Sequence, residues 1–424
     1  MYVYTKEGVL VKILMLGWEF PPFFAGGIGI VCYELSKALA DKNVEVTYIM
    51  PFGPRNTRSP FLKKLITAEN MYPTIKVHRV DTMMHAYMNE ETYTQEYTVR
   101  MLEEKTSATG VKKQLYGKNL LQEVHNFAHR AMLIAEHEEF DIIHCHDWMT
   151  VPAAIGIKHA SKKPLIVHMH NTVFDRYLQN TNSVEYDIEQ RGLDEADKVL
   201  CVSHFIRNTV LTKYHADEQK VGVLHNAAQK MSDAQVAPPT IQAHDRIVLF
   251  AGRITVQKGP DYFVKASRLV ADHMPDVKFV MAGTGDMLTQ MIELVADLGL
   301  GDKFLFPGFY TRDDVDTLFS MADVFVMPSV SEPFGIVPLE AMYKGTPTII
   351  SKQSGCSEVL THVLKVDFWD VEELAEKILA VLAYEELHQT LRSHGKYEVT
   401  QLTWDKVADR MKREYEQLCI EVKR

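Results

Sequence analysis

The sequence of 424 residues is poor in cysteine, in long apolar runs and in excess positive charge. Its five cysteines are scattered and form no Cys-x-x-Cys pair. We therefore expect neither a disulfide framework nor a structural zinc site, and reduced thiols fit a cytoplasmic setting. Lys and Arg total 46 against 56 Asp and Glu, a formal net charge of −10, which argues against a general nucleic-acid partner or a polybasic membrane surface. No apolar run reaches the ~18 residues that span a bilayer, so we expect no stable membrane insertion. Glu7 and Lys12 interrupt the N-terminal apolar stretch, so no signal peptide is expected.

What the sequence does contain is an alternation of short apolar runs and helical spacing. Residues 11–16 (VKILML) end at Gly17 and predict a buried strand. A Gly-rich turn, helical spacing over 31–41 and a second strand at 44–50 follow. This order is a βαβ unit and implies a parallel sheet. Further elements are expected as a helix over 119–138 and as strands at 142–145, 165–169, 199–203 and 221–226.

Two segments depart from this pattern. Residues 53–117 are polar and rich in Met and Tyr, and we interpret them as an insertion of loops and short helices. Residues 228–244 are small, polar and proline-bearing, which is typical of a linker. The βα pattern then restarts, with strands expected at 247–252, 277–283, 304–308, 323–328 and 346–351. Two doubly wound α/β domains joined by a hinge are the economical interpretation; one large open sheet is the alternative, disfavoured because the linker falls near mid-chain.

The sharpest motif is SEPFGIVPLEAMYKGTP, at residues 331–347. A strand is expected to end at Pro328 and a helix to begin near Gly335, so that the first helical amides favour an anion. Glu332 precedes the turn, and Glu340 lies eight residues later. One carboxylate can then reach sugar hydroxyls while the other holds a ribose diol. The alternative is a capping acid and a solvated helix residue, which the surrounding E-P-F-G and L-E-A-M groups disfavour.

A second motif, AGRITVQKGPDYF, places two cations behind another strand. Arg253 and Lys258 follow a strand that ends at Gly252, and a helix opens after Pro260. Cations at a strand's carboxyl end beside a helix N-terminus can clamp a diphosphate without a metal. A solvated surface loop is the alternative interpretation, and it is the better one for this motif taken by itself.

The glycine loop PPFFAGGIGIV, residues 21–31, lets backbone approach a ligand closely at Gly27. It is not G-x-G-x-x-G, no acid at the expected spacing supports a nicotinamide site, and the chain has no Walker A lysine motif. A tight strand-to-helix turn is the alternative.

Two His-x-His pairs lie on neighbouring predicted strands, in HCHDW (144–148) and VHMHN (167–171). Alternate strand residues share a face, so each pair could line one cavity. No third acidic or cysteine ligand sits at a matching spacing, and we therefore predict no metal site. One or two of these histidines are expected to hydrogen-bond substrate, and the others to be buried and satisfied.

Together these motifs resemble the retaining nucleotide-sugar glycosyltransferases with the GT-B fold, and among them the glycogen (starch) synthase-like enzymes. The resemblance runs from KILMLGWEFPP at 12–22 to LTWDKVADRMKREY at 402–415. It implies two Rossmann-like domains facing a cleft. These would be an acceptor-side domain at 1–227, which holds the insertion 53–117, and a nucleotide-sugar-binding domain at 245–403. A linker at 228–244 would join them, and a C-terminal helix at 404–424 would cross back to the first domain.

The resemblance also implies roles for single residues. Arg253 and Lys258 would bind the donor diphosphate, Glu332 would contact the transferred sugar, and Glu340 would contact the ribose. The remaining donor contacts would come from Gly27, Phe334, Gly335 and Ile336. His170 would be the active-site histidine, and His146 and Asp147 would lie on the acceptor side. Three departures leave the donor and the acceptor open: Ala25 where Lys is common, Asn226-Ala227 for N-G, and Ser354-Gly355-Cys356 for G-G.

The expected function is therefore a metal-independent, retaining transfer of a hexose, with glucose as the expected sugar. The donor would be ADP- or UDP-glucose, the acceptor an α-glucan or oligosaccharide end, and no cofactor would be needed. Three alternatives stay open at this point. They are a related glycosyltransferase that makes a small glycoside or glycolipid, a sugar-nucleotide epimerase, and a binder without catalysis.

Overall fold

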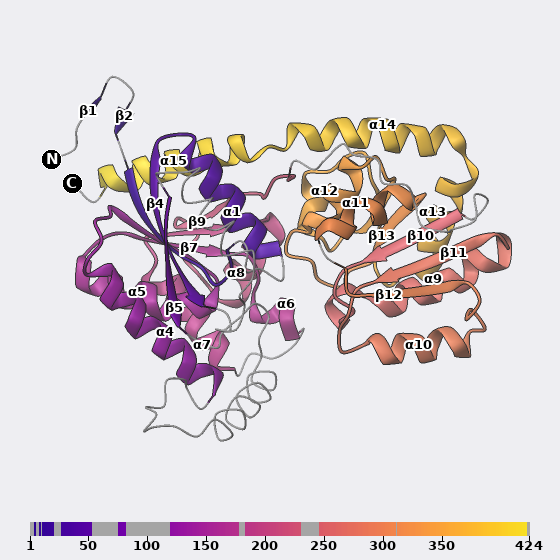
Figure 1. The fold of residues 1–424 in the computed structure, drawn as a ribbon, viewed down its shortest axis with the longest axis horizontal. Helices are drawn as coiled ribbons and strands as arrows, with labels where there is room; N and C mark the ends of the chain where they lie inside the picture. The colour runs from indigo at the N-terminus through magenta and orange to yellow at the C-terminus, as the bar shows by residue number, and fades with distance from the viewer. Residues whose placement is uncertain are drawn as a thin grey trace.

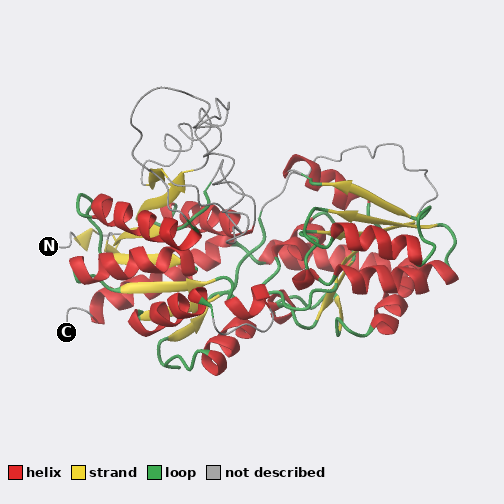
Figure 2. Cartoon of the chain, turned by 90° about the horizontal axis from the view of Figure 1, so that it is seen from below, coloured by secondary structure: helices red, strands yellow, loops and turns green. Residues whose placement is uncertain are grey.

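The computed structural model describes residues 4–5, 8–9, 11–20, 27–52, 75–81, 119–177, 183–229, 246–310 and 312–421. Two parallel sheets, each flanked by helices, organise this part of the chain (Figure 1). The chain is thus α/β, as the sequence predicts. Figure 2, which views the molecule from below, shows the two halves lying next to each other with strands enclosed by helices in each.

The N-terminal half contains a seven-stranded sheet in the order β5-β4-β3-β6-β7-β8-β9, with every neighbouring pair parallel. Its strands are β3 (Val11–Leu16), β4 (Val44–Phe52), β5 (Ile75–Asp81), β6 (Ile142–His146), β7 (Leu165–Met169), β8 (Lys198–Cys201) and β9 (Val221–Val223). Its helices are α1 (Gly27–Ala40), α4 (Leu120–Ala135), α5 (Val151–Ser161), α6 (Val173–Tyr177), α7 (Val184–Glu195) and α8 (His204–Lys213), with a 3₁₀ turn η1 (Trp148–Thr150). All residues of β6 and β7 are buried, because helices cover both faces of the sheet. A separate antiparallel hairpin joins β1 (Tyr4–Thr5) and β2 (Gly8–Val9).

The C-terminal half contains a six-stranded parallel sheet in the order β12-β11-β10-β13-β14-β15. Its strands are β10 (Arg246–Ala251), β11 (Val277–Ala282), β12 (Phe304–Gly308), β13 (Val324–Met327), β14 (Thr348–Ser351) and β15 (Leu364–Val366). The helices are η2 (Val256–Lys258), α9 (Pro260–His273), α10 (Leu288–Asp297), α11 (Arg312–Met321), α12 (Ile336–Tyr343), η3 (Gly355–Glu358), α13 (Val371–Ala383), α14 (Glu385–Gln401) and α15 (Trp404–Glu421).

Helix α15 lies on the N-terminal half, although it follows the C-terminal half in sequence (Figure 1). Lys42, just after α1, forms ion pairs of 2.7 Å with both Asp405 and Asp409. Met411 and Tyr415 on the opposite side of these charges are fully buried. Helix α15 therefore packs against the N-terminal half, next to α1.

Two sequence-based expectations need correction. Residues 75–81, within the predicted insertion of loops and short helices, form the edge strand β5, paired with β4. This strand was not predicted because its sequence, IKVHRVD, contains polar residues and is not an apolar run. The short strand β15 was also not predicted. Most of 53–117, and residues 230–244 of the predicted linker, lie outside the described residues. Within the described ranges, no helix is both long enough and apolar enough to cross a membrane.

Candidate active site

The predicted donor motifs meet where the strand order of the C-terminal sheet reverses. Strands β10 and β13 are neighbours, but the chain continues from β10 toward β11 on one side and from β13 toward β14 on the other. Ligands of open α/β sheets bind outside the carboxyl ends of the strands at such a point. Arg253 stands two residues after β10, and the loop 328–335 begins directly after β13. The fold thus brings together two motifs that are separated by about seventy residues in sequence.

Lys258 and Glu332 form an ion pair at this switch point. Their side chains are only 16% and 9% exposed, so the two charges neutralise each other away from bulk water. The hydroxyl of Ser329 donates to the same oxygen of Glu332 at 3.4 Å. The cation predicted to hold a diphosphate and the acid predicted to hold sugar hydroxyls are therefore direct partners in this structure.

Backbone packing fixes the two loops against each other. Gly259, which precedes α9, has a φ of 62°, and a Cβ atom there would lie 2.2 Å from the carbonyl oxygen of Pro328. Only glycine fits such a conformation at such a distance. The amide of Val330 donates to the carbonyl of Gln257 at 2.9 Å, and the guanidinium of Arg253 donates to the Gln257 side chain at 3.2 Å. Lys258 and Arg253 thus stand on a loop with little freedom to move.

Helix α12 begins where the sequence predicts, directly after Gly335, whose φ is 94°. Its amides supply partial positive charge at the switch point. Glu340 is buried within this helix, as are Phe334 and Ile336 at its start. Gly27, the first residue of α1, lies beside Ile336: a Cβ atom at Gly27 would stand 3.5 Å from its side chain. The N-terminal ends of one helix from each half therefore approach one another.

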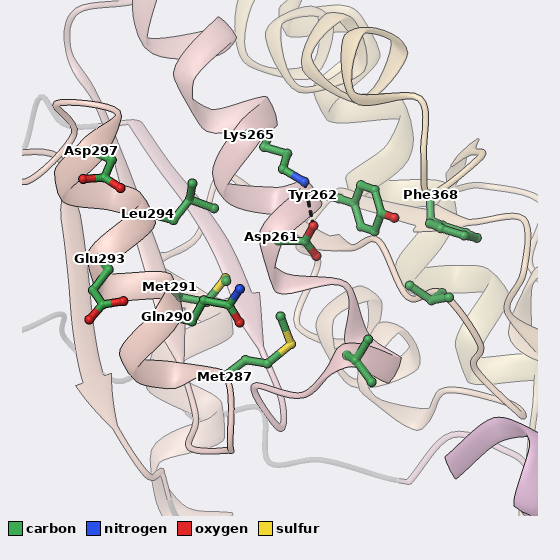
Figure 3. Close-up of a pocket in the computed structure, with 12 residues that line it drawn as sticks. Asp261, Tyr262, Lys265, Met287, Gln290, Met291, Glu293, Leu294, Asp297 and Phe368 are labelled. Atoms are coloured by element: carbon green, nitrogen blue, oxygen red, sulfur yellow. Dashed lines mark hydrogen bonds and ion pairs between the residues drawn. The ribbon is translucent and has the colours of Figure 1, made fainter. Parts of the chain in front are cut away.

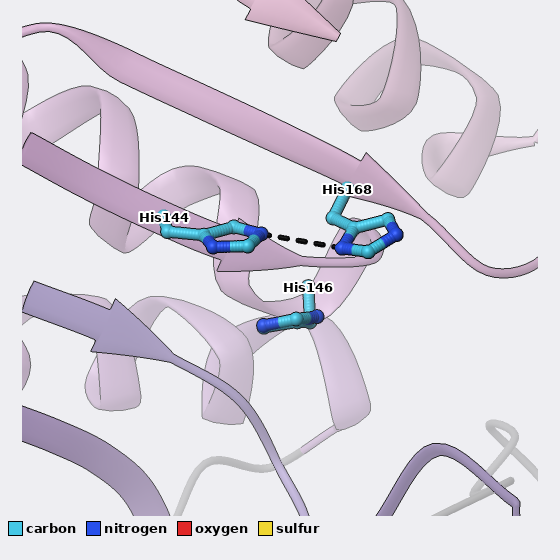
Figure 4. A group of neighbouring side chains, drawn as sticks. All are labelled: His144, His146 and His168. Atoms are coloured by element: carbon cyan, nitrogen blue, oxygen red, sulfur yellow. Dashed lines mark hydrogen bonds between the residues drawn. The ribbon is translucent and has the colours of Figure 1, made fainter. Parts of the chain in front are cut away.

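The four histidines of the two His-x-His pairs form one stack at the carboxyl ends of β6 and β7. The rings of His168 and His170 are inclined by 30° with centroids 4.3 Å apart, and those of His144 and His146 by 25° with centroids 4.5 Å apart. Figure 4 shows three of them, with a contact of 3.3 Å between ring nitrogens of His144 and His168. Burial lowers the pKa of all four, that of His168 to about 3. The rings are therefore neutral at physiological pH.

His170 is the most exposed member of the stack, at 6%. Its Nε2 lies 2.7 Å from Nδ1 of His146, and its amide donates to the carboxylate of Asp147 at 2.7 Å. Burial raises the pKa of Asp147 to about 7, although the amide of His170 partly offsets this. His146 and Asp147 are themselves fully buried, and their contacts position His170; that they lie on the acceptor side stays a prediction.

The expectation that the other histidines would be satisfied is not met within the described part of the chain. Nε2 of His146, Nε2 of His168 and Nδ1 of His170 have no hydrogen-bond partner there. His144 does have one, because its Nδ1 lies 2.6 Å from the hydroxyl of Tyr415 on α15.

Sequence reasoning missed the residues that connect the two halves. The hydroxyl of Ser331, in the loop 328–335, donates to Asp175 at 2.6 Å. Ser203 caps α8 and donates to the carbonyl of Pro333 at 2.6 Å. The only signals for these residues were a Ser after a predicted strand and an Asp five residues beyond His170, and neither indicates a partner in the other half.

A pocket of about 540 Å³ lies between α9 and α10, and Val256 and Val330 from the two loops described above also line it. Figure 3 shows Tyr262 and Phe368 at one end and Glu293 and Asp297 at the other. It contains none of the site residues that the sequence predicts, so we do not assign it to the donor.

Comparison with known proteins places these observations in a family. The starch synthase catalytic domain matches residues 12–226, and the glycosyl transferases group 1 family matches residues 232–397. An uncharacterized glycosyltransferase of Methanocaldococcus jannaschii is 29% identical over 366 residues, which make up 83% of each chain.

Solved structures agree with the fold. Sucrose-phosphate synthase from Thermosynechococcus elongatus gives a TM-score of 0.74 at 20% identity and covers 96% of this chain and 99% of its own. HepE of Anabaena, solved with UDP and glucose, gives a TM-score of 0.70 at 18% identity and covers 96% and 100%. These neighbours share the GT-B architecture. This chain belongs to the GT-B glycosyltransferases, with a starch synthase catalytic domain in its N-terminal half and a group 1 glycosyltransferase domain in its C-terminal half.

Proposed function

We propose that the protein transfers glucose, with retention of configuration, from a nucleoside diphosphate sugar to the end of an α-glucan. The observation that carries this proposal is the gathering of Arg253, Lys258 and the start of α12 at the switch point of the C-terminal sheet. Two side-chain cations and helical amides at one place suit a diphosphate. The binding of UDP and glucose by HepE of Anabaena supports a donor of this class.

In this proposal the chemical difficulty is the negative charge that develops on the leaving diphosphate. The bond between the anomeric carbon and the phosphate oxygen breaks while the acceptor hydroxyl oxygen bonds to that carbon from the same face. The acceptor proton passes to the departing phosphate oxygen. Arg253, Lys258 and the amides of α12 stabilise the charge electrostatically, and no metal or cofactor takes part. Glu340 holds the ribose and Glu332 the transferred sugar.

The N-terminal half would supply the acceptor side. His170 stands at the carboxyl end of β7, held by His146 and Asp147 from behind. We assign His170 to the neighbourhood of the reacting sugar and give the two buried residues a positioning role.

The test is an array of nucleotide sugars and acceptors, read by nucleotide release and by product mass. Release from ADP- or UDP-glucose that depends on maltooligosaccharides, with products one hexose heavier, is the expected result. Transfer only to a small molecule or a lipid would overturn the glucan acceptor. The absence of release with every pair would overturn the proposed reaction.

Two further readouts test the mechanism. Digestion of the product by an α-specific glucosidase would confirm retention, and resistance to it would contradict it. Activity is expected to survive EDTA; a full loss restored by Mg²⁺ or Mn²⁺ would count against a metal-independent reaction.

A further inference from the structure

A cluster of two histidines and one glutamate bridges the two halves beside the loop 328–335, since the ring centroid of His225 lies 6.2 Å from that of Phe334. His204 is the first residue of α8, His225 follows β9, and Glu358 ends η3 in the C-terminal half. Nε2 of His225 lies 2.8 Å from the carboxylate of Glu358. One ligand atom from each of the three residues lies within 4.8 Å of the other two. We call these three residues the seam cluster.

The carboxylate in the seam cluster is held rigidly before any ion arrives. One oxygen of Glu358 accepts the amide of His204 at 2.8 Å, and the other accepts the amide of Phe205 at 2.7 Å. The C-terminal half thus caps a helix of the N-terminal half. Partial burial works to raise the pKa of Glu358, but the hydrogen bonds from His225 and from these two amides outweigh it and lower the pKa. The carboxylate is therefore charged and oriented.

Two imidazoles and a carboxylate are the donor set that zinc-like ions take. The 2.8 Å contact between His225 and Glu358 is a hydrogen bond; a tetrahedral ion with ligands at about 2.0–2.2 Å would replace it and move these two atoms slightly further apart. The rings of His204 and His225 are inclined by 58°, so their in-plane lone pairs can converge. His204 is exposed, which leaves a path for the ion and room for water as a fourth ligand.

The buried histidine stack is a poorer candidate, although its ring nitrogens are also close. The planes of His144 and His168 are inclined by only 18°, and those of His144 and His146 by 25°. Lone pairs in nearly parallel rings do not converge on one point. These rings are also buried, and both nitrogens of His144 already have partners, at 3.3 Å in His168 and at 2.6 Å in Tyr415.

We propose that the seam cluster binds one divalent transition-metal ion of the zinc class, and that the ion fastens the two halves together. The site is complete only while Glu358 stands beside α8, so ion binding favours this arrangement over any in which the halves separate. The ion has a structural role in this proposal, which stands independently of the donor and acceptor assigned above.

The first experiment measures Zn²⁺ binding to the full chain after chelator treatment and dialysis, by titration calorimetry. We expect one saturable equivalent in the wild type. His204→Ala removes an exposed ring and keeps the backbone amide that Glu358 accepts, so the fold is retained. The affinity should fall at least about tenfold, the smaller end of the losses seen even for groups that only support metal ligands.

A matched control is His159→Ala. His159 forms a 3.0 Å ion pair with Glu195 inside the N-terminal half, so it tests whether any histidine–carboxylate pair would serve. This variant should bind Zn²⁺ as the wild type does. Equal affinity in His204→Ala and the wild type, or no saturable binding in either, would overturn the proposed site.

A second measurement tests whether the bound ion stabilises the contact between the two halves. At one fixed Zn²⁺ concentration, the thermal midpoint should rise in the wild type and in His159→Ala by clearly more than in His204→Ala. Co²⁺ in place of Zn²⁺ should give visible absorption bands that are lost in His204→Ala and in Glu358→Gln. A midpoint that rises equally in all variants would show that the ion acts elsewhere, and would contradict the proposal.

Discussion

Replacing Lys258 by Met, alone and together with a change at Glu332, should distinguish the contribution of this lysine to stability from its contribution to turnover. The substitution leaves the carboxylate of Glu332, 9% exposed, without its cation. Removing one partner of a buried pair costs about 3–5 kcal/mol, and the residual exposure of both side chains places this pair near the lower limit, at about 3 kcal/mol. For a folding unit of about 150–250 residues, the thermal midpoint shifts by about 2–4 °C per kcal/mol. The midpoint should therefore fall by about 6–12 °C.

The double variant Lys258→Met with Glu332→Gln removes both charges and keeps the volume of both side chains. It should recover most of the lost stability, because no uncompensated charge stays buried. Activity should not recover. Loss of one charge-stabilising donor costs about 10²–10³ in turnover, and the double variant still lacks that donor.

The assay pairs circular-dichroism melting with nucleotide release, measured well below the midpoint of the single variant. Lys265→Met is the control: Lys265 pairs with Asp261 at 2.7 Å on the surface of α9 and is 47% exposed. Its loss should cost under about 1 kcal/mol and leave turnover unchanged. An unchanged midpoint in Lys258→Met, or renewed turnover in the double variant, would refute the reasoning.

Three further substitutions probe the scaffold. Burial lowers the pKa of His168 to about 3. Below pH ~6.5 this histidine is therefore protonated in the unfolded chain but stays neutral in the folded protein. In urea unfolding, the wild type should therefore lose about 0.7 kcal/mol between pH 7 and 6 and about 1.2 kcal/mol between pH 6 and 5 relative to His168→Gln, and parallel pH profiles would contradict this. Gly259→Ala should cost more than about 2 kcal/mol of unfolding free energy, from its φ of 62° and its backbone clash. Gly299→Ala, with φ 65° and open space around it, should cost about 1 kcal/mol; equal losses would exclude the clash. Tyr415→Phe leaves a buried nitrogen of His144 without its 2.6 Å partner and should cost about 1–3 kcal/mol; a neutral result would show that α15 is held without that contact.

The sequence predicts which segments form helices and strands better than it predicts which of these elements pack against one another. Apolar runs such as 11–16 and 165–169 became strands with the expected bounds, because strands buried on both faces must be apolar throughout. The edge strand β5 was missed because an edge position tolerates polar residues. The predicted strand 199–203 ends at Cys201, since Ser203 instead caps the next helix.

The same limit applies to the site. Arg253, Lys258, Glu332 and Glu340 belong to local motifs, so sequence spacing could single them out before the strand order was known. The contacts between the halves have no such pattern. Ser331 and Asp175 are 156 residues apart in sequence, and Pro333 and Ser203 are 130 apart. Such a hydrogen bond between the halves depends on how the two sheets face each other. The local spacing of apolar and polar residues carries no information on that arrangement.

The ion pair of Lys258 and Glu332 bears on how a donor would enter the proposed site. In the arrangement described here the pair is neutral overall, and the site presents little net charge at that position. A diphosphate carries more negative charge than one carboxylate, so it competes for the ammonium of Lys258. Glu332 then needs new donors, and the hydroxyls of the attached sugar can supply them. A nucleoside diphosphate without its sugar would break the same pair and leave the carboxylate uncompensated. The pairing thus favours the intact donor over the spent nucleotide, which is the preference that an enzyme of the proposed kind requires to release its product.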